Sequence, residues 1–219
     1  CTLANTEKPD VPQLVADIEK SNEDYIAACR ARFQTATATR PEDSEFRYHL
    51  NAARSALSEE SAFADLVIVG DSSNDSPVES LLSADDALFA ASSPVLVVPH
   101  DYGRDFVPGT VFVAWKNTRE AARAVRDALP LLHIARKIVV GAVAVRDSDR
   151  DDRLDDIARY LGRHGLEAET REVPAAGPVG RTIIEQAGAA GADLIVAGGY
   201  GHTPLSEWLM GGVTEALLH

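Results

Sequence analysis

The sequence predicts an α/β fold made of two tandem parallel-sheet domains with helices on both faces. Short apolar runs rich in β-branched residues alternate with amphipathic helical patterns, which is typical of strands joined by crossover helices. One run occurs twice: residues 64–70 (ADLVIVG) return as residues 192–198 (ADLIVAG), 128 positions later. This spacing exceeds the roughly 20–50 residues of solenoid and propeller repeats, so we interpret it as a duplicated domain.

The second copy, residues 106–219, opens with an apolar strand over residues 110–115. We expect the next helix to start at an Asn117 cap, with Glu120 completing a capping box, and to end or kink at Pro130. The remaining strands are expected over 137–145, 167–173 and 194–197, and the remaining helices over 151–161 (stopped by Gly165), 179–190 and 206–218.

The elements of the first copy, residues 1–105, are predicted by aligning it with the second copy at the repeated segment. It begins with a long helix whose apolar stripe consists of Leu14, Ile18, Tyr25, Cys29 and Phe33. The expected strands lie near 45–50, 66–69 and 94–99 (PVLVVP), the expected helices over 52–63 and 78–91, and a linker over 100–108.

Each copy lacks elements that the other has. The first has no counterpart of the strand–helix–strand at 110–145, and the second has no counterpart of PVLVVP. A sheet without its opening strands cannot close around a core. We therefore expect both ends to be truncated, the sequence being a fragment of a longer chain. The alternative is a natively shortened copy that another chain completes.

Composition excludes several classes of partner. The 219 residues carry 34 Asp and Glu against 21 Lys and Arg, a formal net charge of −13. Nucleic acids and anionic membranes attract the opposite sign, so neither is an expected partner. Two cysteines are too few for a disulfide framework, and no apolar run approaches the roughly 20 residues of a membrane span. No leader pattern is seen, and the cytoplasm is the expected location.

Common catalytic and metal-binding motifs are absent from the sequence. It has no P-loop, no nucleophile elbow and no His-Glu-x-x-His. Asp147 and Asp149 begin like a calcium loop, but Asp152 stands where that loop needs glycine and Ala158 where it needs glutamate. No nucleophile–base pair or paired carboxylates can be placed, so we assign no catalytic and no metal-binding residue.

A glycine-rich segment is the most specific chemical feature. Gly198 and Gly201 follow a strand, and Gly211 and Gly212 come after nine further residues. Glycines let the backbone approach a ligand closely, and N–H groups at a loop and helix start suit phosphates. The loop also falls at the carboxyl end of the sheet, where open α/β folds bind ligands. The alternative is a tight turn in which glycine serves packing only.

The second copy resembles a universal stress protein domain, an α/β fold similar to that of the adenine nucleotide α-hydrolases. Nucleotide-binding members of that family carry Gly-x2-Gly-x9-Gly-Ser/Thr after the fourth strand, and Gly198, Gly201 and Gly211 match its glycines. The resemblance covers most of residues 110–219, and the first copy resembles a second, degenerate unit. The chain is thus identified as a tandem universal stress protein.

The sequence departs from the family pattern at two positions of the second copy. Gly212 replaces the Ser/Thr hydroxyl but keeps its backbone N–H, and Lys116 stands where ATP-binding members usually have Asp. Lys116 has no acceptor atom; it faces either phosphate as a point charge or solvent as a turn residue. In the first copy Gly70 is followed by Asp71 and Asp75 without a second glycine, so we expect no nucleotide there.

These observations lead to a binding function, with ATP and Mg²⁺ as the expected ligand of the second copy. The resemblance implies that Gly198 and Gly201 shape the loop, that backbone N–H groups of Gly211, Gly212 and Val213 meet the phosphates, and that Ala142 and Val143 back the adenine. The alternative is a nucleotide-free interaction module, an internal pseudo-dimer or a homodimer that recruits a protein partner. Slow ATP hydrolysis is a third reading.

Overall fold

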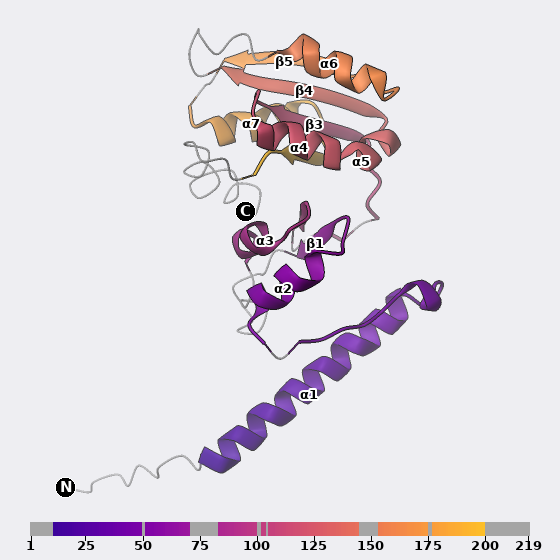
Figure 1. The fold of residues 1–219 in the computed structure, drawn as a ribbon, viewed down its shortest axis with the longest axis vertical. Helices are drawn as coiled ribbons and strands as arrows, with labels where there is room; N and C mark the ends of the chain where they lie inside the picture. The colour runs from indigo at the N-terminus through magenta and orange to yellow at the C-terminus, as the bar shows by residue number, and fades with distance from the viewer. Residues whose placement is uncertain are drawn as a thin grey trace, which may run out of the picture. The chain divides into compact units, whose positions relative to one another are not determined.

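The computed structural model describes residues 11–49, 51–70, 83–99, 102–103, 105–144, 153–174 and 177–199. The chain divides into two compact units, Cys1–Ala52 and Ala53–His219, each of which is described by itself. The second copy and the half-sheet of the first copy both belong to the larger unit (Figure 1).

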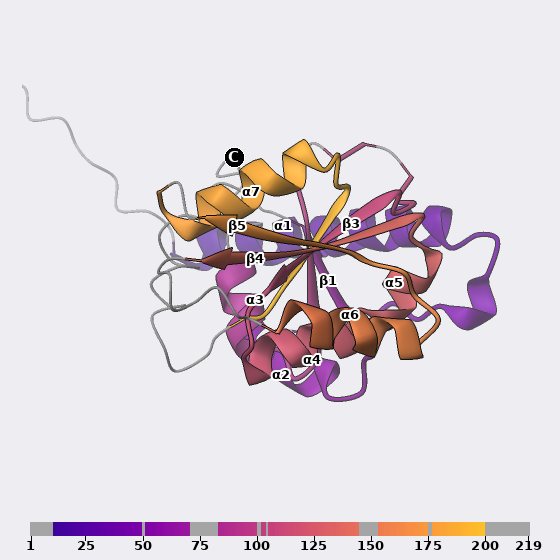
Figure 2. The ribbon, with the colours of Figure 1, turned by 90° about the horizontal axis from the view of Figure 1, so that it is seen from above.

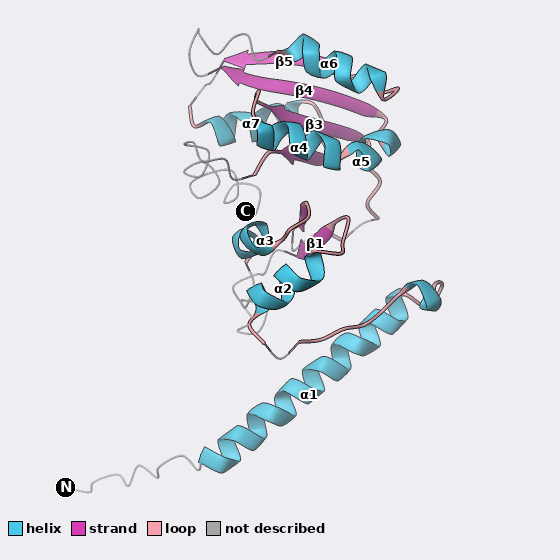
Figure 3. Cartoon of the chain, in the orientation of Figure 1, coloured by secondary structure: helices cyan, strands magenta, loops and turns pink. Residues whose placement is uncertain are grey.

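The second copy is built on a four-stranded parallel sheet. Its strands are β3 (Thr110–Trp115), β4 (Lys137–Ala144), β5 (Glu169–Pro174) and β6 (Leu194–Ala197), in the spatial order β5-β4-β3-β6. Every neighbouring pair is parallel. All four lie where the apolar runs predict them, and strands and helices alternate along the chain as in a crossover fold (Figure 3). The predicted α/β class is confirmed.

Helices cover both faces of this sheet, as Figure 2 shows. On one face α4 (Arg119–Asp127), α5 (Leu129–Ile134) and α6 (Leu154–Arg163) pack against β3 in a core that contains Val111, Val113, Val125, Leu132 and Leu161. On the other face α7 (Val179–Ala189) buries Ile183 and Ala187 against Phe112 and Val139. Successive side chains of β3 are therefore buried in two separate cores, one on each face of the sheet.

The start of α4 corrects one expectation. The cap is Thr118, not Asn117: its hydroxyl accepts the Ala121 N–H at 3.3 Å. With the cap at Thr118, the third helical residue is Ala121, so Glu120 cannot complete a capping box. Pro130 acts as expected, because α4 ends at Asp127 and the proline occupies the first turn of α5, where no N–H is needed.

The C-terminus of α6 is ended by Gly165, as predicted. Gly165 has a φ of +74°, its N–H donates to the Gly162 carbonyl, and the Leu166 N–H donates to the Leu161 carbonyl at 3.0 Å. These two hydrogen bonds supply donors to carbonyls of the last turn that have no partner within the helix, as in a Schellman motif. The predicted final helix over 206–218 lies outside the described residues, as does the part of the first-copy helix before Ser83.

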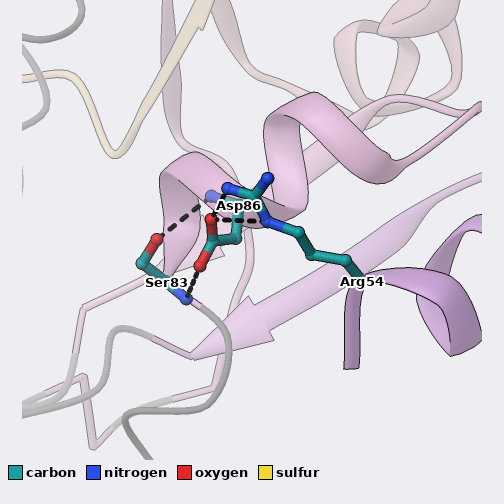
Figure 4. A network of polar contacts seen from close by, with 3 residues as sticks. All are labelled: Arg54, Ser83 and Asp86. Atoms are coloured by element: carbon teal, nitrogen blue, oxygen red, sulfur yellow. Dashed lines mark hydrogen bonds and ion pairs between the residues drawn. The ribbon is translucent and has the colours of Figure 1, made fainter. Parts of the chain in front are cut away.

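The first copy contributes a two-stranded parallel half-sheet to the larger unit. It consists of β1 (Val67–Gly70) and β2 (Val95–Val98), with α2 (Ala53–Ser61) and α3 (Ala84–Ala90). Ser83 caps α3 in a capping box with Asp86, and Arg54 of α2 binds the same carboxylate (Figure 4). These hydrogen bonds, that of Arg54 first, lower the pKa of Asp86 and tie α2 to α3.

The smaller unit holds one long helix, α1 (Val11–Ala36), and a 3-10 turn, η1 (Pro41–Asp43). The chain then runs back beside the helix, where the Phe46 ring lies 5.6 Å from that of Phe33 and under the Arg30 guanidinium. The strand expected near 45–50 is not formed over residues 44–49, which make no strand ladder. A strand needs a neighbouring strand, and the described residues of this unit provide none.

The titration of Glu169 tests the polar contacts of the edge strand β5. Its carboxylate accepts from Arg171 Nε at 2.8 Å and pairs with Lys137 Nζ at 3.0 Å, which together lower its pKa to about 2. Because the folded-state pKa is depressed, this contribution to stability is present above the ordinary pKa and is lost as pH falls toward 2. Carboxyl-detected NMR should show a midpoint near 2 that rises in Arg171→Met and, less, in Lys137→Met. An ordinary midpoint in the unmodified chain would contradict the assigned contacts.

Candidate functional site

The strand order places a topological switch point between β3 and β6. The chain runs from β3 to β4 and β5 on one side of β3 and then returns through α7 to β6 on the other side, so the strand order reverses between β3 and β6. In open α/β sheets ligands bind in the crevice at this point. The register aligns Ala114 with Ala197, so the residues that follow these strands emerge at one edge. We call Trp115, Lys116, Gly198 and Gly199 the switch-point edge.

The side of this edge that follows β3 carries an unneutralised cation. Trp115 is 8% exposed and closes the core under α4. Lys116 is exposed, and no acid in the described part of the chain pairs with it. Its carbonyl accepts the Thr118 N–H at 2.6 Å, which turns the chain into α4.

The side that follows β6 is in backbone contact with α4. A Cβ on Gly198 would lie 2.6 Å from Ala121 N and 2.8 Å from the Glu120 carbonyl carbon, closer than real Cβ contacts come. Gly198 is therefore needed for this approach, with no positive φ involved. Gly199, in contrast, faces open space and is exposed. Packing thus accounts for Gly198 but not for Gly199.

Charges beside the edge sum to one positive charge. The Glu120 carboxylate accepts from its own backbone N–H and from Arg119 Nε, and these hydrogen bonds lower its pKa and keep it ionised. An acid in the first turn also matches the helix dipole. Because Arg119 neutralises Glu120, Lys116 remains as the net charge of these three groups.

The two residues expected to back an adenine lie at the end of β4. Ala142 stands opposite Trp115 in the ladder, is 3% exposed and belongs to the α4–α6 core. Val143 is half-buried and packs with the α7 core on the other face. Successive strand residues point to opposite faces, so only one of the two can present its side chain to a given ligand.

The rest of the predicted loop lies outside the described residues. This applies to Gly201, Gly211, Gly212 and Val213. Within the described ranges, no three His, Cys, Asp or Glu side chains gather in a way that could hold a metal ion. In the same ranges, every helix falls short of the length or apolarity that crossing a bilayer requires.

Asp193 is a structural residue that the sequence analysis did not single out. Its Oδ2 accepts the Gly109 N–H at 2.9 Å and the Thr110 N–H at 3.0 Å, and its own N–H donates to the Thr110 carbonyl at 2.8 Å. Asp193 thus clamps the start of β6 to the start of β3. The available signal was its position in the repeat, where Asp65 is the counterpart.

Comparison with known proteins now identifies the family. The model of the universal stress protein family matches residues 109–219, just over half of the chain. The chain belongs to the universal stress protein family. The match begins at Gly109, directly before β3, and so contains the whole four-stranded sheet and the switch-point edge.

Solved structures share this fold. A universal stress protein from Archaeoglobus fulgidus DSM 4304 is similar with a TM-score of 0.69 and 16% identity, over 96% of this chain and 77% of that one. A functionally unknown protein from Pseudomonas aeruginosa PAO1 is similar with a TM-score of 0.52 and 19% identity, over 85% and 72%. A search among curated proteins returned no match.

Alanine substitution tests the role of Gly198. Gly198→Ala forces a methyl group into the α4 backbone, which cannot move aside as a side chain can, and overpacking of this kind costs about 1–3 kcal/mol. Urea denaturation of the chain measures the loss. Gly199→Ala and Gly70→Ala are matched controls, since nothing lies within 4 Å of either added Cβ. Equal stability of the Gly198 and Gly70 variants would contradict the backbone contact.

Asp193→Ala tests the clamp at the other end of the strand. The substitution leaves the N–H groups of Gly109 and Thr110 without their acceptor, and Gly109 is buried, so we expect a loss of about 1–3 kcal/mol in the free energy of unfolding. Asp65→Ala, its counterpart in the first copy, should change stability little. A neutral Asp193→Ala would show that water replaces the carboxylate.

Proposed function

We propose that this universal stress protein acts by binding an adenine nucleotide, ATP with Mg²⁺, at the switch-point edge of its second copy. The observation that supports this most is the combination of Lys116, a cation without a partner among the described residues, with the open space around a Cβ added at Gly199, at the carboxyl ends of the neighbouring strands β3 and β6. A polyphosphate is the ligand chemistry that a positive charge and free backbone N–H groups favour.

The proposed roles follow the order of the chain. Lys116 faces the phosphates as a point charge, and the carboxyl end of β4 around Ala142 and Val143 backs the base. Gly198 fixes the start of the loop against α4 and Gly201 shapes its turn. Gly211, Gly212 and Val213 supply backbone N–H groups. Mg²⁺, when bound, neutralises part of the triphosphate charge.

The first copy is proposed to bind no nucleotide. Its equivalent glycine, Gly70, is followed in the sequence by Asp71 and Asp75 rather than by glycines, and carboxylates repel phosphate. The protein we propose is therefore a tandem protein with one nucleotide-binding copy. We propose the cytoplasm as its location.

One observation favours a second candidate function. The backbone contact with α4 explains Gly198 without any ligand. On that basis the chain would be a nucleotide-free interaction module, in which two copies form an internal pseudo-dimer, or two chains a homodimer, that recruits a protein partner. Lys116 and Gly212 would then mark a site that no longer binds phosphate.

Calorimetric titration with Mg-ATP, ADP and AMP separates the two candidates. We expect saturable binding near one site per chain, lost in Gly201→Val and weakened in Lys116→Met. Gly70→Val in the first copy is the matched control and should bind as the unmodified chain does. At 100 times its dissociation constant, ATP should add about 2.7 kcal/mol to stability. Absence of heat and of thermal shift at millimolar ATP would contradict nucleotide binding and support the interaction module.

A further inference from the structure

β5 is the outermost strand on one side of the four-stranded sheet. Its ladder is made with β4, and no described strand pairs with its other side. The chain enters β5 from α6 and leaves it into α7, so this edge belongs to an interior segment of the matched family domain. Figure 2 looks onto the edge, where β5 runs between α6 and α7. Backbone N–H and C=O groups along such an edge can pair with a further strand.

Two oppositely charged side chains stand two positions apart on β5. Successive side chains of a strand alternate, so Glu169 and Arg171 share one face of the sheet and Thr170 lies on the other. The Glu169 carboxylate accepts from Arg171 Nε at 2.8 Å and pairs with Lys137 Nζ at 3.0 Å. The side chains of Glu169 and Arg171 are 45% and 32% exposed, so a second molecule can reach both of them.

The order of these residues makes the strand complementary to a second copy of itself. Two β5 strands related by a two-fold axis at Thr170 run antiparallel, with Thr170 opposite Thr170 of the partner subunit. Glu169 then lies opposite Arg171 of the partner subunit, and Arg171 lies opposite Glu169 of the partner subunit. Unlike charges and paired threonines at directly opposite positions both stabilise an antiparallel strand pair.

The neighbouring registers are unfavourable. Moving the axis by one residue places either Arg171 opposite Arg171 of the partner subunit or Glu169 opposite Glu169 of the partner subunit. Like charges at directly opposite positions destabilise a strand pair. The charges therefore select the register that is centred on Thr170, in which every charged pair is attractive across the axis.

We propose that Glu169, Thr170 and Arg171, here called the β5 edge surface, bind the same surface of a second copy of this chain. The two β5 strands pair antiparallel, so that the sheets of both subunits become continuous. A two-fold interface requires a surface that is complementary to itself, and the register centred on Thr170 gives the β5 edge surface this property. Backbone hydrogen bonds of the added strand supply affinity, and the two charge pairs supply specificity.

Such a dimer does not use the switch-point edge. The strand order is β5-β4-β3-β6, so β4 separates the β5 edge surface from the carboxyl ends of β3 and β6. Dimerisation and the proposed nucleotide binding therefore involve different parts of the second copy, and either of them can fail in an experiment without the other.

Sedimentation equilibrium of the 219-residue chain measures its self-association. We expect a reversible dimer of the unmodified chain, and slower backbone hydrogen exchange in β5 as the dimer forms. Glu169→Arg brings two arginines together at both charge pairs, and Arg171→Glu brings two glutamates together. Each substitution should therefore weaken the dimer by roughly tenfold or more. Exchanging both charges in one chain keeps the complementarity, so this double variant should dimerise as the unmodified chain does.

An equimolar mixture of Glu169→Arg and Arg171→Glu is the most specific test. In the mixed dimer each arginine again lies opposite a glutamate, so the mixture should associate as tightly as the unmodified chain. Glu185→Arg is the matched control, because it makes the same charge change at an exposed residue of α7 and should leave the dimer unchanged. Circular dichroism should show all variants folded.

Three results would overturn the proposal. The unmodified chain could remain monomeric up to millimolar concentration. The single variants could associate as tightly as the unmodified chain, which would place the interface elsewhere. The mixture could fail to regain the affinity that each single variant has lost, which would show that the two charges do not lie opposite each other across the interface.

Discussion

The pairing of β3 with β6 is the contact on which the second copy depends. These strands are far apart in sequence, and their ladder joins the first strand of the matched family domain to the last strand that the structure describes in it. Asp193 clamps the amino ends of both strands, and Gly198 lets the carboxyl end of β6 reach the first turn of α4. With both ends fixed, the carboxyl ends of the two strands lie side by side, and Lys116 follows one of them.

Most of the second copy's fold could be predicted from its sequence, because the strands are continuous apolar runs buried on both faces. β6 has the bounds expected for it, and β3 does too. The errors lie where local signals compete. Asn117 and Thr118 are both good caps, and the choice depends on which backbone is extended. Residues 44–49 have a strand-like sequence, but strand pairing is a property of neighbours and not of the segment.

The position of the candidate site in the fold could be predicted from the sequence better than the structural role of each of its residues. Strand order places Lys116 and Gly198 at one edge, as the switch-point rule requires. The reason for Gly198, however, is a backbone approach to Ala121 and Glu120, which no spacing in the sequence encodes. Asp193 was missed because a carboxylate before a strand carries no local signal for its tertiary partners.

The central claim is that the second copy binds nucleotide at the switch-point edge while the first copy binds none. Backbone NMR of the chain titrated with Mg-ATP tests it most directly. Chemical shifts should move at Lys116, Gly199 and the end of β4, and remain unchanged at Gly70 and along β2. Shifts confined to the first copy, or none at Lys116 and Gly199 at saturating ATP, would contradict the claim.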